Sequence, residues 1–287
     1  MVTEYPSASK AFNSTIQAFK NNPLLFTPFL IFAVFESLAL LFLYLIPRYP
    51  LINIFGPIIR TFWGDRFLHY PFNFFLLPKL AANSRMVLSV LLGSLFSGMA
   101  VAIVWNLYNQ KAIKLAYSLR LSIKKYLSLF TIVLILTATY YCLLKFLNIV
   151  LAKYFIARHS RLLFLPSRLW LGTILICLNF ILDIIIQSAF TYAIPIVMAE
   201  NEKTIKAIGK SLFRFKRFFV PTLILVGVPM LFYIPIIVLN SNIPFLIMRL
   251  SPESVLGVAF LSIIIGSLII DAVITIATTF FYLENKK

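Results

Sequence analysis

The chain has 287 residues, of which 61% are hydrophobic and 12% are charged, and its mean hydropathy is +0.95. A soluble domain is about 45–50% apolar and about 25% charged, so this composition excludes a soluble globular fold and indicates an integral membrane protein. The net charge of +17 does not indicate a nucleic-acid partner, because membrane proteins concentrate Lys and Arg in the loops that stay in the cytoplasm.

Six apolar stretches are long enough to cross a bilayer as helices, since about 20 residues span a hydrocarbon core of ~30 Å. They are Leu24–Ile46, Met86–Tyr108, Tyr126–Val150, Leu169–Met198, Phe219–Leu239 and Val255–Tyr282. The runs are continuous and do not alternate with period two, which disfavours a membrane β-barrel. The sequence therefore predicts an all-α integral membrane protein with six transmembrane helices in one domain, residues 1–287.

Basic residues are unevenly distributed among the loops. If the N-terminus is inside, the two termini and the loops 109–125 and 199–218 carry 15 Lys and Arg residues, whereas the loops on the opposite side carry 10. The positive-inside rule then predicts a multi-pass protein of the plasma membrane with both termini in the cytoplasm.

A basic stretch before the fifth span has the pattern of an amphipathic helix. At about 100° per residue, one face of it is apolar and the opposite face is cationic. The cationic residues are Lys203, Lys206, Lys210, Arg214 and Arg217. Such a helix lies at the membrane interface, with its cations toward anionic lipid headgroups or an acidic partner. The alternative is a topology signal and anchor that needs no specific ligand.

Similar stretches precede the first span, at 14–30, and the third span, at 118–134. We infer three copies of one unit, each made of an interfacial helix, a span, an outer loop and a second span. The approximate bounds of the units are 7–108, 109–198 and 199–283. A unit with an even number of spans keeps the same orientation in every copy, as in parallel repeats.

The outer loop 47–85 is rich in aromatic residues and contains five prolines. Irregular backbone cannot face lipid, and Trp and Tyr prefer the headgroup level. We expect short helices that lie on the outer face or cap it, with a lid over a cavity as the alternative. Cys142 and Cys177 both fall within predicted spans, so neither a disulfide framework nor a cysteine-rich metal site is expected.

Three carboxylates fall near the middle of predicted spans: Glu36, Asp183 and Asp271. An ionised carboxylate there costs at least ~2.5–3.5 kcal/mol on insertion scales, so each should face protein or water and find a partner. Gln187 lies one turn beyond Asp183, and Lys145 of the third span is a candidate cation. One hypothesis is a proton- or cation-responsive polar centre; the other is that the acids hold helices together through hydrogen bonds.

No catalytic template is present. The sequence has no HExxH, no GxSxG and no Walker-type glycine-rich loop, and its two histidines lie in different outer loops. Enzyme activity is therefore not expected, and neither a metal nor a cofactor is implied. A membrane-embedded lipid-modifying enzyme is the catalytic alternative, and it would need a polar cluster at one interface.

Residues 189–225 read AFTYAIPIVMAENEKTIKAIGKSLFRFKRFFVPTLIL. This stretch resembles the six-span membrane domain attached to some bacterial glycerophosphodiester phosphodiesterases and its stand-alone, uncharacterised relatives. The positions that carry the resemblance are Pro195, Glu200, Ala207, Ser211 and the Lys216–Arg217 junction. The resemblance implies a six-span architecture, and because the phosphodiesterase domain is absent it implies no catalysis.

Two functions of different classes follow. The first is a non-catalytic membrane component that scaffolds or assists another membrane protein, or organises lipid. The second is a small transporter or permease that uses the midplane carboxylates. A transporter needs a water-accessible cavity that reaches those carboxylates, whereas a scaffold can bury them in dry contacts. The expected partners are the lipid bilayer and its anionic headgroups, with no nucleic acid.

Overall fold

The structure is a computed structural model that describes residues 7–159 and 165–286. Within these ranges every regular element is a helix. Five helical runs are long and apolar enough to cross a membrane, and a bent pair of helices would make a sixth. The apolar helices indicate a protein that passes through a membrane several times.

The five runs are built from one or more helical elements each. The first run, Pro23–Leu45, consists of a 3-10 turn (Pro23–Phe26) and α2 (Thr27–Leu45), and the second, Asn73–Tyr108, consists of α4 (Asn73–Leu88), a π-helix (Ser89–Gly93) and α5 (Ser94–Tyr108). The third, Tyr126–Val150, lies within α7 (Tyr126–His159), and the fourth, Gly172–Glu200, comprises most of α8 (Leu165–Phe190) and α9 (Ala193–Glu200). The fifth, Ser254–Glu284, consists of α14 (Ser254–Ile263), a second π-helix (Ile264–Asp271) and α15 (Ala272–Glu284). The bent pair comprises α11, Phe219–Leu231, and α12, Ile234–Ser241.

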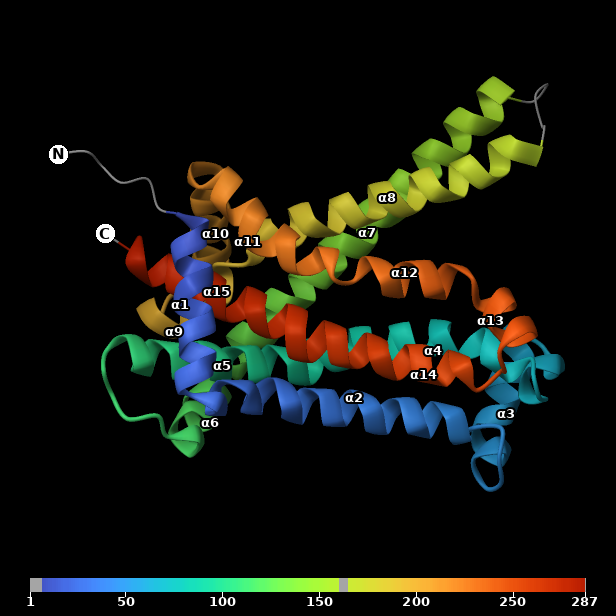
Figure 1. Ribbon diagram of the computed structural model, residues 1–287, viewed down its shortest axis with the longest axis horizontal. Helices are drawn as coiled ribbons and strands as arrows, with labels where there is room; N and C mark the ends of the chain where they lie inside the picture. Colours follow the sequence, from blue (N-terminus) through green and yellow to red (C-terminus); the bar gives the residue numbers. More distant parts are fainter. Residues whose placement is uncertain (1–6, 160–164, 287) are drawn as a thin grey trace.

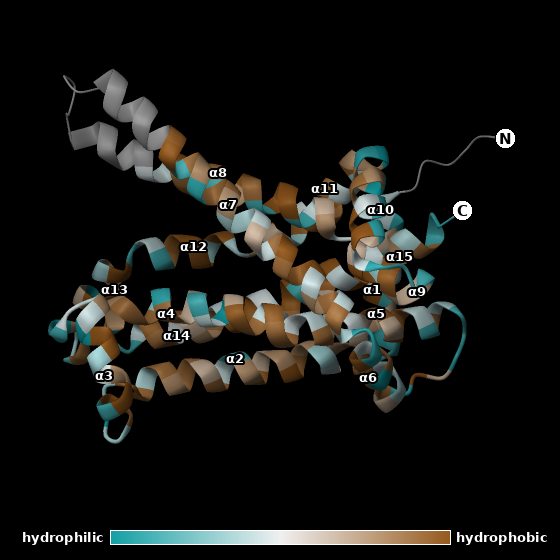
Figure 2. Ribbon diagram, turned by 180° about the vertical axis from the view of Figure 1, so that it is seen from behind, coloured by the Kyte–Doolittle hydropathy of each residue, from teal (hydrophilic) through white to brown (hydrophobic). Residues whose placement is uncertain are grey.

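Shorter helices gather at the two ends of this bundle (Figure 1). One end holds both termini with α1 (Ala8–Asn21), α6 (Leu115–Lys124) and α10 (Thr204–Arg217). We call it the terminal end. The other end holds α3 (Leu51–Phe62) and α13 (Ile243–Arg249), and we call it the α3 end. Hydrophilic residues concentrate at both ends, while the helices between them are mostly apolar (Figure 2).

The second span begins at Asn73, earlier than the predicted start at Met86. The last part of the stretch 47–85 is therefore not an outer loop but helix α4, which continues through the π-helix into α5. Only its first part forms separate elements, α3 and a 3-10 turn at Asp65–Leu68. The helix runs on because neither Pro nor Gly occurs between Pro78 and Gly93.

The fifth apolar stretch is broken. Helices α11 and α12 meet at an angle of 48° at Phe232–Tyr233. Pro229 lies inside α11 and Pro235 lies in the first turn of α12. Each proline removes a backbone donor and crowds the preceding turn, which accounts for the bend.

Helix α5 is the most buried part of the bundle. Its residues from Met99 to Val104 are at most 3% exposed, and they pack among α6, α9 and α15. At Gly98 an added Cβ would lie 2.5 Å from Leu129 Cδ1 and 2.6 Å from Ser122 Oγ, so only glycine permits this approach. The tight packing fixes the helices that frame the site described below.

Helices α7 and α8 form a hairpin that diverges from the other helices toward its tip (Figure 1). Only 11% of the residues in the most apolar stretch of each are buried, compared with 56% for the α4–α5 run. Their exposed side chains are largely apolar, among them Leu134, Phe146 and Ile181. This hairpin therefore offers most of its surface to lipid.

Candidate functional site

A partly buried arginine joins the first, second and last apolar runs. Arg85 Nε on α4 lies 3.0 Å from Glu36 Oε1 on α2, and Arg85 Nη2 lies 3.6 Å from Asp271 Oδ2 at the end of the second π-helix. Glu36 Oε2 accepts a hydrogen bond from Ser267. The Glu36 side chain is 2% exposed. We call Glu36, Arg85 and Asp271 the charged cluster.

The backbone around the charged cluster leaves room for the guanidinium. A Cβ on Gly266 would overlap the Arg85 guanidinium, with Cζ only 2.7 Å away. Gly266 lies in the π-helix Ile264–Asp271, and the other π-helix, Ser89–Gly93, follows Arg85 in the chain. Such wide turns are rare in proteins and are often found at functional sites. In the first π-helix the Leu91 carbonyl, displaced from regular α-helical pairing, accepts a hydrogen bond from Tyr126 Oη at 3.0 Å.

The charged cluster holds one cation and two carboxylates. Removing one partner of a buried pair leaves an uncompensated charge, which typically costs 3–5 kcal/mol. The Arg85 and Asp271 side chains are 26% and 38% exposed. Arg85 lines one cavity and Asp271 lines another.

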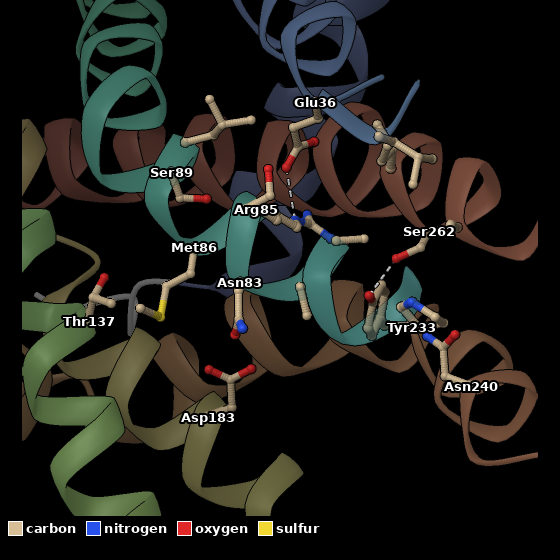
Figure 3. A pocket seen from close by; sticks show the side chains of 18 of the residues that line it. Glu36, Asn83, Arg85, Met86, Ser89, Thr137, Asp183, Tyr233, Asn240 and Ser262 are labelled. Carbon is tan, nitrogen blue, oxygen red and sulfur yellow. Dashed lines mark hydrogen bonds and ion pairs between the residues drawn. The ribbon is translucent and has the colours of Figure 1, made fainter. Parts of the chain in front are cut away.

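The first cavity, cavity 1, has a volume of about 480 Å³ and lies on the side of the charged cluster toward the α3 end. Helices α2, α4, α7, α8, α12 and α14 supply its walls, together with Tyr233 between α11 and α12. Glu36 and Arg85 lie on one side of it, and Asp183 lies on the opposite side with its carboxylate toward Asn83 (Figure 3). Tyr233 and Ser262 also line the cavity, and Tyr233 Oη lies 2.6 Å from Ser262 Oγ.

The second cavity, cavity 2, has a volume of about 210 Å³ and lies toward the terminal end. Its polar lining includes Asp271, Gln187, Ser97 and Thr278. Ser89, at the start of the first π-helix, lines both cavities. The charged cluster therefore lies between two spaces that approach it from opposite ends of the bundle.

Asp183 differs from the other two midplane carboxylates. It forms no ion pair with any residue in the described parts of the chain, although it is close enough to Asp271 and Arg85 to interact with them electrostatically. Tyr140 of α7 lines cavity 1 beside it. Cavity 1 thus contains a carboxylate that forms no direct ion pair with a cation of the described residues.

The structure brings four of the five residues of the predicted polar centre around this region. Glu36 and Asp183 line cavity 1, and Asp271 and Gln187 line cavity 2. Lys145 lies exposed on α7 and lines neither cavity. The cation that pairs with the carboxylates is Arg85, which the sequence places in the outer loop. Its signal was the stretch without Pro or Gly before Met86, which keeps Arg85 in the helix.

The predicted basic face lies on α10, and part of it is neutralised by the protein. Lys210 Nζ donates hydrogen bonds to Glu200 at 2.7 Å and Glu202 at 2.8 Å, and these bonds raise the pKa of Lys210. Arg214 stacks over the Tyr282 ring at 4.4 Å, and Tyr282 donates a hydrogen bond to Glu200. These contacts tie α9, α10 and α15 together at the terminal end.

The remaining cations of this face, Lys203, Lys206 and Arg217, are exposed.

Lys125, which lies between α6 and α7, caps the C-terminus of α9. Its Nζ donates hydrogen bonds to the carbonyls of Val197 at 2.9 Å and Met198 at 3.0 Å. Burial lowers the pKa of Lys125. The favourable contact of a cation with carbonyls at a helix C-terminus accounts for its place there.

Within the described residues no group of three or more His, Cys, Asp and Glu side chains could hold a metal ion. Cys142 and Cys177 are free thiols on the exposed surface of α7 and α8. Comparison with known proteins gives no match to a family model, to a curated protein or to a solved structure. The resemblance of residues 189–225 therefore stays a prediction, and the geometry of the site is the basis for assigning a function.

Proposed function

We propose that the chain is a small membrane transporter whose substrate enters cavity 1 and meets the midplane carboxylates. Cavity 1 carries this proposal, because a protein that only scaffolds a partner has no need of about 480 Å³ of space beside Asp183 and Glu36. Binding sites of transporters lie near the midplane, where irregular helices line a cavity. The two π-helices and the break between α11 and α12 are irregularities of that kind.

The charged cluster supports the proposal through its position. Cavity 1 reaches it from the α3 end and cavity 2 from the terminal end, and Ser89 borders both. A transporter must keep one closed layer between the two aqueous sides at any moment. We propose that the ion pairs from Arg85 to Glu36 and Asp271 form part of that layer.

The scaffold hypothesis accounts for only part of the site. Glu36 is buried in contacts with Arg85 and Ser267, as an acid that holds helices together would be. Asp183, however, has no such partner among the residues that the structure describes, and it lines cavity 1. Transport explains both carboxylates, which is why we favour it.

We further propose six spans, with both termini in the cytoplasm and the chain in the plasma membrane. The bent pair α11–α12 supplies the sixth span by length and composition. Because Arg85 pairs inside the bundle, it leaves the count for the outer loops, which falls from 10 to 9 against 15 on the terminal side. The larger difference supports a cytoplasmic terminal end.

The threefold repeat is part of this proposal, and three helix junctions support it. A single residue separates the end of each of α1, α6 and α10 from the start of the next helix, at Pro23, Tyr126 and Phe219. At the same distance before each helix end lies a fully buried hydroxyl: Thr15, Ser118 and Ser211. We propose that these helices lie in the interface and that exposed cations such as Lys203 contact anionic headgroups.

Thiol labelling from each side of sealed vesicles tests the transport proposal. In a background with Cys142→Ala and Cys177→Ala, we expect Thr137→Cys in cavity 1 to react with a membrane-impermeant methanethiosulfonate applied at the α3 end. Ser97→Cys in cavity 2 should react from the terminal end. Leu38→Cys, which is 56% exposed on the outside of α2, is the control that faces lipid. If neither cavity cysteine reacts faster than Leu38→Cys, the cavities are dry and the proposal fails.

A further inference from the structure

We propose that cavity 1 binds an organic cation, with Asp183 as the counter-ion. The inference rests on the proposed transport function and names the substrate class of the same site. It draws on the balance of charge, the size of the cavity and the side chains around Asp183.

The charges that line cavity 1 do not balance. Among the described residues, two carboxylates, Glu36 and Asp183, and one guanidinium, Arg85, line it, and no lysine does. Arg85 is already shared between Glu36 and Asp271. Both carboxylate oxygens of Glu36 already have partners, Oε1 in the ion pair with Arg85 and Oε2 in the hydrogen bond from Ser267, so Asp183 is the carboxylate of the cavity that lacks an ion pair within the described residues. An anionic ligand would meet Arg85, which already pairs with two carboxylates, and would be repelled by the unpaired carboxylate of Asp183. The site therefore favours a cation.

The size and lining of cavity 1 favour an organic cation over a metal ion. Its volume of about 480 Å³ lies within the range of roughly 300–1,000 Å³ that is common for small-molecule pockets. The described residues contain no cluster of carboxylate, imidazole and thiol ligands for a metal. Leu40, Leu136 and Ile263 instead provide apolar walls for the body of a larger ligand.

The groups near Asp183 suit a cation with an apolar body. Tyr140, close to Asp183, and Tyr233 also line the cavity, and tyrosine rings attract ammonium and quaternary groups. Asn83 of α4 faces Asp183 (Figure 3), Thr137 of α7 also lines the cavity, and both side chains can accept hydrogen bonds from a protonated amine. A carboxylate with aromatic and apolar walls is a recognition site for amphipathic cations.

Tetraphenylphosphonium and tetraphenylborate form a matched pair of probes, because they share shape and apolar surface but carry opposite charges. Binding of each to the purified full-length protein is measured by equilibrium dialysis against protein-free micelles. We expect saturable binding of tetraphenylphosphonium and none of tetraphenylborate. Asp183→Asn should weaken the cation's binding at least about 30-fold, as expected when one partner of a buried charge pair is lost, and Asp183→Glu should restore most of it.

A control at another acid guards against a folding defect, and a change at Tyr140 tests the aromatic contribution. Asp65→Asn makes the same change at an exposed acid near the α3 end and should leave binding unchanged. Tyr140→Leu should weaken binding a few-fold by removing an aromatic face. Equal binding of the two probes, or equal affinity in the Asp183→Asn and original proteins, would overturn the inference.

The outcomes separate this inference from the transport proposal. If Thr137→Cys reacts in vesicles but tetraphenylphosphonium does not bind saturably, a wet cavity exists and its substrate is not an organic cation. If neither result is obtained, both proposals fail. Saturable binding that depends on Asp183, together with labelling of Thr137→Cys, supports both.

Discussion

Gly266 permits the charged cluster to form, and its replacement by alanine tests that role. The added methyl would lie 2.5 Å from Nη1 and 2.7 Å from Cζ of Arg85, so the guanidinium must move. The end of an arginine side chain moves easily by itself. Here, however, the same guanidinium group pairs through Nε with Glu36 at 3.0 Å and through Nη2 with Asp271 at 3.6 Å, so a shift away from Gly266 weakens both ion pairs.

Two opposing terms set the expected size of the effect. Breaking a buried ion pair costs about 3–5 kcal/mol, and we take the lower end because the Arg85 side chain is 26% exposed. Replacing glycine by alanine within a helix returns about 1 kcal/mol. The net loss of stability for Gly266→Ala is therefore about 2 kcal/mol, which corresponds to a fall in Tm of roughly 4–8 °C.

Thermal unfolding of the detergent-purified protein, followed by tryptophan fluorescence, measures this loss. Gly257→Ala is the matched control in the same apolar run, because its new methyl would meet nothing within 4 Å. It should be neutral or slightly stabilising. In a protein that already carries Arg85→Ala, the further change Gly266→Ala should cost nothing. The reasoning is refuted if Gly266→Ala is as stable as Gly257→Ala, or if its cost persists without the guanidinium.

Three further predictions concern the packing and the two ends of the bundle. Gly98→Ala should lower stability by about 1–3 kcal/mol in the same unfolding assay, because the methyl would press on Leu129 and overpacking carries that cost. Hydrogen bonds from Arg60 and His69 lower the pKa of Asp65 below 3.8, so the stabilisation they provide is complete above pH 3.8 and is lost as pH falls through the lowered value. Hydrogen-exchange protection of the backbone around Asp65, corrected for intrinsic exchange rates, should therefore decrease below pH 3.8 in the original protein. The same pH change should not alter the protection in the Asp65→Asn variant. Changing Lys203 and its exposed neighbouring cations to Gln should weaken co-sedimentation of a peptide of α10 with anionic vesicles at low salt, and unchanged affinity would contradict the electrostatic reasoning.

The sequence predicts the helical class and the position of the carboxylates because both depend on local composition. A run of apolar residues identifies a span, and an acid near its centre is visible without a structure. The cation that pairs with Glu36 and Asp271 is harder to find. Arg85 directly precedes the apolar run that begins at Met86, so hydropathy alone assigns it to a loop. Three carboxylates within the membrane need a cation as partner. If the helix of the second span is continuous before Met86, Arg85 is the basic residue that it places inside the bundle.

Other features depend on contacts that no local pattern encodes. The π-helix Ser89–Gly93 is supported by the hydrogen bond from Tyr126, which lies on another helix. The position of Lys145 could not be fixed, because whether a lysine reaches inward or outward depends on the divergence of the α7–α8 hairpin. By contrast, the bend between α11 and α12 follows from Pro229 and Pro235, whose effect is local.

The ion pair between Glu36 and Arg85 also bears on biogenesis. The ribosome releases both residues long before Asp271, which lies in the final apolar run. Partitioned alone into hydrocarbon, each charge would carry a cost of at least ~2.5–3.5 kcal/mol, whereas an early helical hairpin can pair them during insertion. When the last apolar run is inserted, Asp271 can pair with the Arg85 guanidinium that is already in position. On this order of events, the N-terminal half of the chain directs the packing of the last helix.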